Sequence, residues 1–218
     1  MKKIVSITGF FFLFVVVSQA CTVFSPNAEQ NADGNVLFRD DFSNQSGQWD
    51  VINDAEAVTD YIDGSYRILV NDSNWYYWSN PGKRSFNDVR MEVDVNKAAG
   101  PDENDMGLIC RYQDKDNFYF GVIGSDGFYA VFKIKDGNET LIGMEEYGFD
   151  DKSIKTGNNA NHIRLDCIGS KLSLYANNTL LVEVEDTDFP EGNVGLLAGT
   201  YDTPGVDVYF DNFVVKKP

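Results

Sequence analysis

The densest aromatic run of the chain, Asn74-Trp75-Tyr76-Tyr77-Trp78, carries side chains that could bind a sugar. Ligand sites of this kind combine aromatic rings, which cover apolar surface, with a few polar groups that fix orientation. If the run is a β-strand, alternation places Trp75 and Tyr77 on one face and the other two rings on the opposite face. One pair at most is then exposed, because the other pair packs in a core. We predict Trp75, Tyr77 and Trp78 as ligand contacts.

Arg111 and Tyr119 are the candidate polar and aromatic partners of that run. Each follows a residue that we expect to point inward, Cys110 and Phe118 respectively, so each is expected on the opposite face of its strand. That placement could bring both onto the concave sheet of a sandwich as ligand contacts. Arg111 could equally be an ion-pair partner of nearby acidic residues, so both interpretations stay open.

His162 is the single histidine of the sequence, and this limits the catalytic chemistry. A Ser-His-Asp triad would have to use it, but no Gly-x-Ser-x-Gly nucleophile elbow occurs in the chain. A zinc site needs more histidine or cysteine ligands than the sequence supplies. We interpret His162 as a surface residue of a strand.

Residues 1–20 have the composition of an export signal. A positive start and an apolar run to Val17 precede the small-residue exit Ser18-Gln19-Ala20. The apolar run is shorter than the roughly 20 residues that span a bilayer as a helix. Cys21 follows directly and resembles the acylated cysteine of bacterial lipoproteins, although Ser18 stands where that motif has an aliphatic residue. We predict lipidation of Cys21, with ordinary signal-peptidase cleavage after Ala20 as the alternative.

The two remaining cysteines, Cys110 and Cys167, are predicted to form a disulfide. Both fall at inward positions of alternating strands, and oxidised pairs persist in exported proteins. The alternative is two buried thiols that pack as small hydrophobic groups.

The formal net charge of −16 excludes some classes of partner. A strongly negative surface repels phosphate backbones and anionic headgroups, so we expect no nucleic-acid partner and membrane contact only through a lipid anchor. Such a charge suits a soluble protein of the bacterial cell envelope, lipid-anchored or secreted, or a surface that takes up divalent cations.

Beyond the signal, the sequence predicts a tether followed by one β domain. Residues 21–35 are polar and aperiodic, which predicts a lipidated N-terminus and a flexible tether. Within residues 36–218, the segment 107–134 predicts three strands in a row, whose apolar face must pack against a second sheet. The pair Asn177-Asn178 predicts a hairpin turn, and a change of phase at Asp211-Asn212 predicts a β-bulge.

These strands predict an all-β fold of one domain. We find neither a helical pattern of three turns nor an internal repeat in the sequence. Strands at this spacing predict a two-sheet antiparallel β-sandwich of about a dozen strands. We expect the domain to be a monomer.

The last third of the chain carries motifs that specify the fold further. Together with GLICRY and NFYFGVI, they resemble the concanavalin A-like (laminin G-like) jelly-roll domain of bacterial extracytoplasmic lipoproteins, over roughly residues 36 to 216. That superfamily includes lectins, carbohydrate-binding modules, family 16 glucanases and a group similar to 3-keto-disaccharide hydrolases, so a shared fold does not select among these functions. The motifs are NHIRLDC (161–167), GSKLSLYAN (169–177), LVEVED (181–186), GNVGLLAG (192–199) and VYFDNF (208–213).

The catalytic motif of one member group of that superfamily is only half present in the sequence. Family 16 glucanases carry Glu-x-Asp-x-x-Glu on one strand, and glycoside hydrolysis needs two carboxyl groups about 5 to 10 Å apart. Glu92 and Asp94 match the first half, but Lys97 occupies the position of the second Glu. We therefore expect no enzyme activity and interpret Glu92 and Asp94 as outward charges of a strand.

The resemblance also implies a metal. Jelly-roll binding modules often hold a structural calcium ion between their first and last strands, and Asp40, Asp41 and Asp211 lie at matching positions. Calcium prefers the oxygen ligands that these residues supply. We expect no other cofactor.

We therefore expect a non-catalytic surface binding module whose ligand class is carbohydrate. The alternatives are a diverged glycoside or keto-disaccharide hydrolase, and a purely structural domain of the envelope. An exposed aromatic pair on an open face would favour the binding module over the structural domain.

Overall fold

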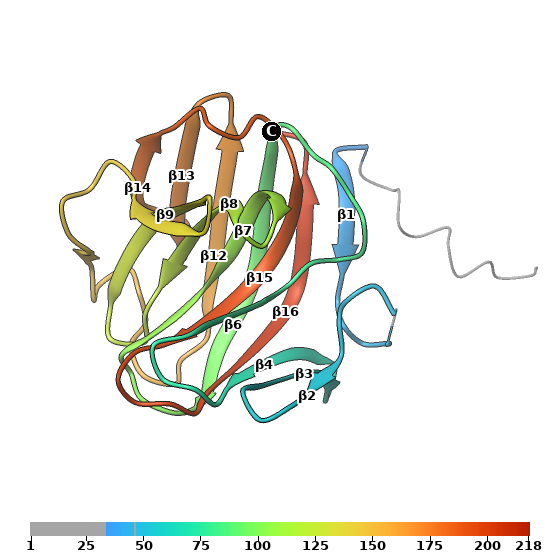
Figure 1. The fold of residues 1–218 in the computed structure, drawn as a ribbon, viewed down its shortest axis with the longest axis vertical. Coiled ribbons are helices and arrows are strands. Elements are labelled where there is room, and N and C mark those ends of the chain that lie inside the picture. The colour runs from blue at the N-terminus through green and yellow to red at the C-terminus, as the bar shows by residue number, and fades with distance from the viewer. Residues whose placement is uncertain (1–33, 46) are drawn as a thin grey trace, which may run out of the picture. The chain divides into compact units, whose positions relative to one another are not determined.

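Short alternating segments joined by tight turns assemble into a two-sheet antiparallel β-sandwich (Figure 1). The computed structural model describes residues 34–45 and 47–218. Sixteen strands lie in this part of the chain, more than the dozen expected, because β2 (Ile52–Asn53), β10 (Asn138–Leu141) and β11 (Gly148–Phe149) are too short for alternation to show. The predicted signal, Cys21 and most of the tether lie outside the described residues.

The first sheet has nine strands, in the spatial order β14, β13, β12, β6, β16, β4, β3 and β2, with β1 also paired to β16. The second has seven, in the order β10, β9, β8, β7, β15 and β5, with β11 also paired to β9. In the first sheet the further bounds are β1 Val36–Asp40, β3 Ala57–Ile62, β4 Ser65–Val70, β6 Val89–Ala99, β12 Asn161–Ile168, β13 Lys171–Ala176, β14 Thr179–Glu185 and β16 Val206–Lys216. In the second they are β5 Tyr76–Ser79, β7 Asn104–Asp114, β8 Asn117–Ile123, β9 Phe128–Lys135 and β15 Asn193–Thr200.

The main core lies between the two sheets, whose strands cross over one another in Figure 1. Val89, Met91 and Val93 on β6 are buried there, as the alternation of this strand predicts. Full burial of such a side chain stabilises the fold by roughly 1.5–3 kcal/mol. The predicted disulfide is confirmed: Cys110 on β7 bonds Cys167 on β12 with a Cα–Cα distance of 6.8 Å, so it joins the two sheets.

A second apolar cluster covers the face of the second sheet that points away from the first sheet. Phe118, Phe120 and Phe132 belong to this cluster, whereas their neighbour Tyr119 belongs to the main core. The expectation that the Phe118–Phe120 face of the meander packs against the other sheet is therefore wrong. Both faces of β8 are apolar, and period-2 alternation alone does not say which one points inward.

Two predicted irregularities are confirmed. Asn177 and Asn178 both have positive φ, 49° and 70°, as a two-residue hairpin turn between β13 and β14 requires. The register of β16 against β6 shifts between Asp211 and Val214, and Asn212 has a φ of 54°. This bulge keeps Phe210 and Phe213 in the same core although they are an odd number of residues apart.

In the part of the chain that the structure describes, no helix is long and apolar enough to cross a membrane.

Candidate ligand-binding surface

A hollow of about 240 Å³ opens on the outward face of the second sheet. Its floor is formed by Phe118 and Phe120 on β8 and by Leu197 on β15, the two strands that flank β7. Aromatic side chains of the 75–78 run make one wall, and two turns make the other. The residues that line it are Asn74, Trp75, Tyr76, Trp78, Lys115, Asp116, Phe118, Phe120, Ile134, Gly137 and Leu197.

The aromatic wall is held in place by packing against the floor. The Trp78 ring lies 5.4 Å from Phe118, and the Tyr76 ring lies 5.4 Å from Phe120 in an edge-to-face arrangement. Such pairs contribute about 0.5–1.5 kcal/mol beyond their buried area. These rings are therefore oriented before any ligand arrives.

The polar wall consists of the β7–β8 and β9–β10 turns. The backbone N–H of Gly137 donates to the carbonyl of Asp116 at 3.1 Å, which joins the two turns. Lys115 pairs with both carboxylate oxygens of Asp116 at 3.0 Å. Gly137 has a φ of +75°, a conformation that a side chain would strain. The hollow thus has charged groups opposite its aromatic wall.

Behind the wall, Tyr76 reaches a buried carboxyl group. The hydroxyls of Tyr76 and Tyr201 both donate to Oδ2 of Asp105 at 2.9 Å, and Tyr147 contacts the Tyr201 hydroxyl at 2.8 Å. Asp105 is 3% exposed, and burial raises its pKa to about 7, against the opposing hydrogen bonds from the two tyrosines. A Cβ on Gly199 would lie 2.5 Å from the Tyr76 ring, so glycine at this position admits the ring.

The structure separates the three predicted aromatic contacts. Trp75 precedes β5 and is 53% exposed at the edge of the hollow. Trp78 lies half-buried on the outward face, whereas Tyr77 packs against the main core. Tyr76 joins Trp78 on the outward face, as alternation predicts, and it is a lining residue that the sequence analysis did not select.

Arg111 and Tyr119 do not lie on this face, which corrects their expected placement. Arg111 is 2% exposed and donates to the carbonyls of Phe189 at 3.0 Å and Gly169 at 2.7 Å. It also pairs with Asp88 at 3.4 Å, in line with the ion-pair interpretation. The cause is a bulge: the β7–β8 register shifts after Cys110, and Arg111 has a φ of 52°, so simple alternation fails there.

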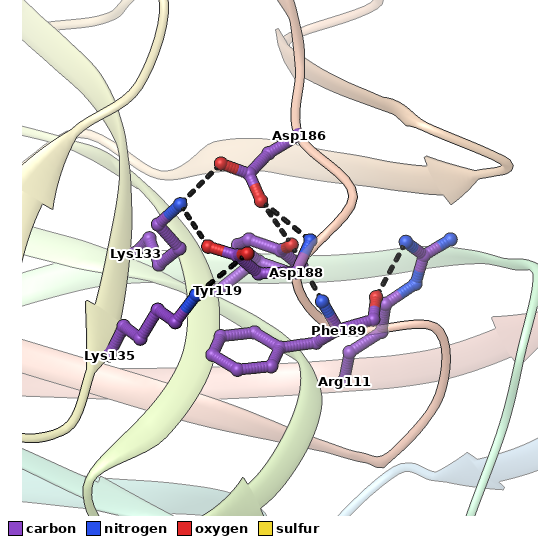
Figure 2. A network of polar contacts seen from close by, with 7 residues as sticks. All are labelled: Arg111, Tyr119, Lys133, Lys135, Asp186, Asp188 and Phe189. Carbon is purple, nitrogen blue, oxygen red and sulfur yellow. Dashed lines mark hydrogen bonds and ion pairs between the residues drawn. The ribbon is translucent and has the colours of Figure 1, made fainter.

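Tyr119 belongs to a polar network that fixes the 186–192 loop between β14 and β15 (Figure 2). Its hydroxyl donates to Asp186 at 2.6 Å and accepts from the backbone N–H of Phe189 at 3.0 Å. Lys133 reaches both Asp186 and Asp188, and Lys135 pairs with Asp188 at 2.8 Å. The carboxylates of Asp186 and Asp188 and the hydroxyl of Tyr119 are all bonded within the protein, so the network positions the loop (Figure 2).

The predicted calcium ligands already have partners inside the protein. Asp40 accepts from the backbone of Phe42 at 2.9 Å and from the Trp49 indole at 3.1 Å. Asp41 accepts from the hydroxyl and the backbone of Ser43. Within residues 34–45 and 47–218, no group of three His, Cys, Asp or Glu side chains is arranged to hold a metal ion. Calcium bound by Asp40, Asp41 and Asp211 stays a prediction.

Glu92 and Asp94, which match half of the glucanase motif, lie on the first sheet, whereas the hollow lies on the second. Glu92 on β6 pairs with Lys216 at 2.7 Å, and Asp94 bonds His162 at 2.8 Å. Lys97 is buried and donates to the carbonyl of Gly100 at 2.9 Å. These carboxylates are therefore committed to the charged face of the first sheet.

Sequence reasoning missed Asp105, Tyr201 and Asp116. Asp116 sits in a turn of acidic residues, and no local signal distinguishes it from its neighbours. Asp105 and Tyr201 are 96 residues apart, so only the tertiary fold shows their contact. The one local hint of this contact is Tyr201 itself, which directly follows the apolar strand β15.

Comparison with known proteins supports the fold alone. No protein-family model and no curated protein matches the chain. Among solved structures, the carbohydrate-binding module CBM66 from Bacillus subtilis matches with a TM-score of 0.62 and 17% identity, over 78% of this chain and 96% of that one. A galectin-like protein of unknown function from Bacillus subtilis matches with 0.63 and 12%, over 84% and 96%. A putative glycosyl hydrolase from Parabacteroides distasonis matches with 0.54 and 16%, over 83% and 100%. The chain thus shares the β-sandwich fold of these proteins.

Proposed function

We propose that this protein is a non-catalytic carbohydrate-binding module whose ligand occupies the hollow on the outward face of the second sheet. The observation that carries the proposal is the exposed ring of Trp75 beside the packed ring of Trp78, opposite the charged turn at Asp116. Aromatic surface and a few convergent polar groups are the composition expected of a small-ligand site. The similarity in fold to a carbohydrate-binding module supports the same ligand class.

The chemistry of the two walls matches that of a sugar. A pyranose ring has C–H groups on its faces, which stack on indole, and hydroxyl groups at its edge. The Asp116 carboxylate can accept from such hydroxyls, and Asn74 can both donate and accept. The wall residues are held by neighbouring rings and by the joined turns, which reduces the entropy lost on binding.

The proposal is tested by glycan-array screening followed by calorimetry on the glycans that bind. We expect Trp75→Ala to weaken binding about tenfold, which corresponds to about 1.4 kcal/mol. Phe149→Ala is the matched control, because Phe149 on β11 is 54% exposed, nearly as much as Trp75 at 53%, and does not line the hollow. Equal affinity of wild type and Trp75→Ala for every bound glycan, or no glycan bound at all, would contradict the proposal.

One observation bears on the alternative of a hydrolase. A glycosidase needs a carboxylic acid that is protonated near neutral pH, opposite a second carboxylate. Asp105 has a pKa raised to about 7 by burial, but it is enclosed, and its Oδ2 already accepts from two tyrosines. We therefore assign it no catalytic role. Release of reducing sugar from a bound glycan that Asp105→Asn abolishes would replace the binding module with a hydrolase.

We further propose that the module is displayed outside the cytoplasm on an acylated Cys21. The support is the export-like composition of residues 1–20 and the Cys110–Cys167 disulfide, a bond that persists in oxidising compartments. Mass spectrometry of the N-terminal peptide from native membranes should show a lipid on Cys21, and Cys21→Ser should release the protein. An unmodified N-terminal cysteine in the membrane fraction would contradict the anchor.

A further inference from the structure

A second hollow adjoins the first along residues 75–78. It has a volume of about 260 Å³ and is lined by Ile52, Trp75, Tyr76, Tyr77 and Trp78. β5 is the last strand in the order of the second sheet, and β2, which carries Ile52, is the last in the order of the first. The second hollow therefore lies at the border of the sandwich, where the end strands of the two sheets approach each other.

The two hollows share side chains of β5 and of Trp75, the residue that precedes it. Trp75, Tyr76 and Trp78 line both, and Trp75 is the most exposed of the three. The backbone of Trp75 is fixed by Thr200, whose N–H donates to the Trp75 carbonyl at 3.0 Å. The backbone of Trp75 is therefore anchored, and its exposed ring offers a stacking surface to a ligand in either hollow.

β5 also supplies polar groups for such a ligand. Trp75 and Thr200 form a hydrogen-bonded pair, so Tyr77 and Ala198 form the next one in the antiparallel ladder. The backbone N–H and C=O groups of Tyr76 and Trp78 then point away from β15. They are directed toward the open edge of the second sheet, where they can bond ring hydroxyls or a glycosidic oxygen of a chain that crosses β5.

We propose that the two hollows are consecutive subsites, so that the ligand is a neutral oligosaccharide chain that crosses β5 over Trp75. This inference rests on the proposed function and extends it to the length and charge of the ligand. Each hollow alone is smaller than the roughly 300–1,000 Å³ of a pocket for a drug-sized ligand, which suits one sugar ring in each.

The charge of the surroundings decides between neutral and acidic sugars. Asp50, Asp54 and Glu56 lie near Tyr77, and burial followed by their negative charges raises the pKa of this tyrosine. The chain as a whole carries a formal charge of −16. Carboxylated or sulfated sugars would be repelled from the second hollow, whereas neutral sugars would not.

The test measures affinity along ladders of neutral glucans, xylans and fructans, from the monosaccharide to the hexasaccharide. We expect affinity to rise about tenfold when the chain becomes long enough to occupy both hollows. Ile52→Ser should remove most of that rise, because Ile52 lines the second hollow only. Val51→Ser is the matched control, because Val51 is the exposed neighbour of Ile52 and does not line the hollow.

The outcomes separate this inference from the proposed function. If a monosaccharide binds as tightly as its hexasaccharide and Ile52→Ser changes neither affinity, the second subsite is wrong while carbohydrate binding stands. If an oligouronate binds more tightly than a neutral chain of the same length, the neutral ligand is wrong. If Trp75→Ala has no effect on any bound glycan, or if no ladder binds at any length, both proposals fall.

Discussion

Two tyrosine–aspartate pairs on opposite faces of the second sheet have opposite electrostatic surroundings. On the inward side, Tyr119 donates to Asp186, which also pairs with Lys133. On the outward side, Tyr76 and Tyr201 donate to Asp105. Burial opposes the ionisation of both carboxyls. In Asp186 the bonds from Lys133 and Tyr119 outweigh it and lower the pKa, whereas in Asp105 burial prevails and raises the pKa to about 7.

The difference shows what a cation does for a buried carboxylate. Lys133 keeps Asp186 charged, so the network of Figure 2 is a permanent clamp on the 186–192 loop. Asp105 relies on hydroxyl donors, and the uncharged form is favoured up to about neutral pH. The first region is built for rigidity. The second leaves a polar group next to the aromatic hollow whose charge depends on pH.

We expect the largest loss of stability when the disulfide is removed, because it joins the inward face of the second sheet to the first sheet. Cys110 and Cys167 are 57 residues apart, and the chain-entropy model gives about 4 kcal/mol for a loop of this length. Cys110→Ala with Cys167→Ala should lower the free energy of unfolding by up to that amount in urea titrations. The aromatic hollow does not use either residue, so glycan affinity of the folded variant should stay unchanged. A loss of affinity would show that the two regions are coupled.

A smaller loss of stability is expected when Lys133, the cation that pairs with both Asp186 and Asp188, is replaced. Lys133 is 15% exposed, and Lys133→Met keeps the apolar stem but leaves Asp186 with Tyr119 as its side-chain donor. We expect a loss of about 2 kcal/mol, below the 3–5 kcal/mol typical of a fully buried pair because the site is partly hydrated. The added variant Asp186→Asn should restore part of the stability, since it removes the unpaired charge. If the double variant is no more stable than Lys133→Met, the explanation by charge is wrong.

The sequence predicts some of these features and cannot predict others, for physical reasons. The inward positions of Val89, Met91 and Val93 follow from alternation with charged residues, and so does the inward position of Cys167. On β8 both faces are apolar, so alternation leaves the inward face undecided.

The candidate site was predictable only where it depended on one strand. Alternation within the aromatic run predicts that Tyr76 and Trp78 share a face, as they do, whereas Trp75 precedes β5 and lies outside that pattern. The burial of Arg111 depends on a left-handed bulge without a glycine, and that of Asp105 on contacts with distant tyrosines. Neither leaves a local pattern in the sequence.

Asp105, on the outward face, makes the stability of the fold depend on pH with a sign opposite to that of Asp186. The unfolded pKa of Asp105 is near 3.8 and the folded value is about 7, so between them the folded state holds a proton that the unfolded state has lost. Stability therefore falls as pH rises through this window, by at most about 1.4 kcal/mol per pH unit. Asp186 has a lowered pKa and contributes stability that is lost as pH falls through its folded pKa.

The variant Asp105→Asn isolates the contribution of Asp105 to the pH dependence of stability. The amide oxygen can accept from both tyrosines, and the variant has no carboxyl to ionise. Between pH 5 and pH 6, wild type should lose up to about 1.4 kcal/mol relative to the variant, measured by chemical denaturation at each pH. Parallel stability curves for the two proteins would show that Asp105 is ionised throughout this range.

The smallest effect is expected at the exposed border of the clamp, where Lys135 lies two residues from Lys133 on β9 and pairs with the same Asp188. The side chain of Lys135 is 47% exposed, so water and salt screen its charge, and exposed ion pairs contribute little to stability. Lys135→Met should therefore lower the melting temperature far less than Lys133→Met. The small difference should vanish in high salt, because screening acts on exposed charges before buried ones. The two lysines share a strand, a face and the acceptor Asp188, so they differ in burial and in the additional pairing of Lys133 with Asp186. Equal destabilisation by both substitutions would mean that the loop is held by the number of charges at this end of the sheet, and not by the enclosed Tyr119–Asp186–Lys133 contact.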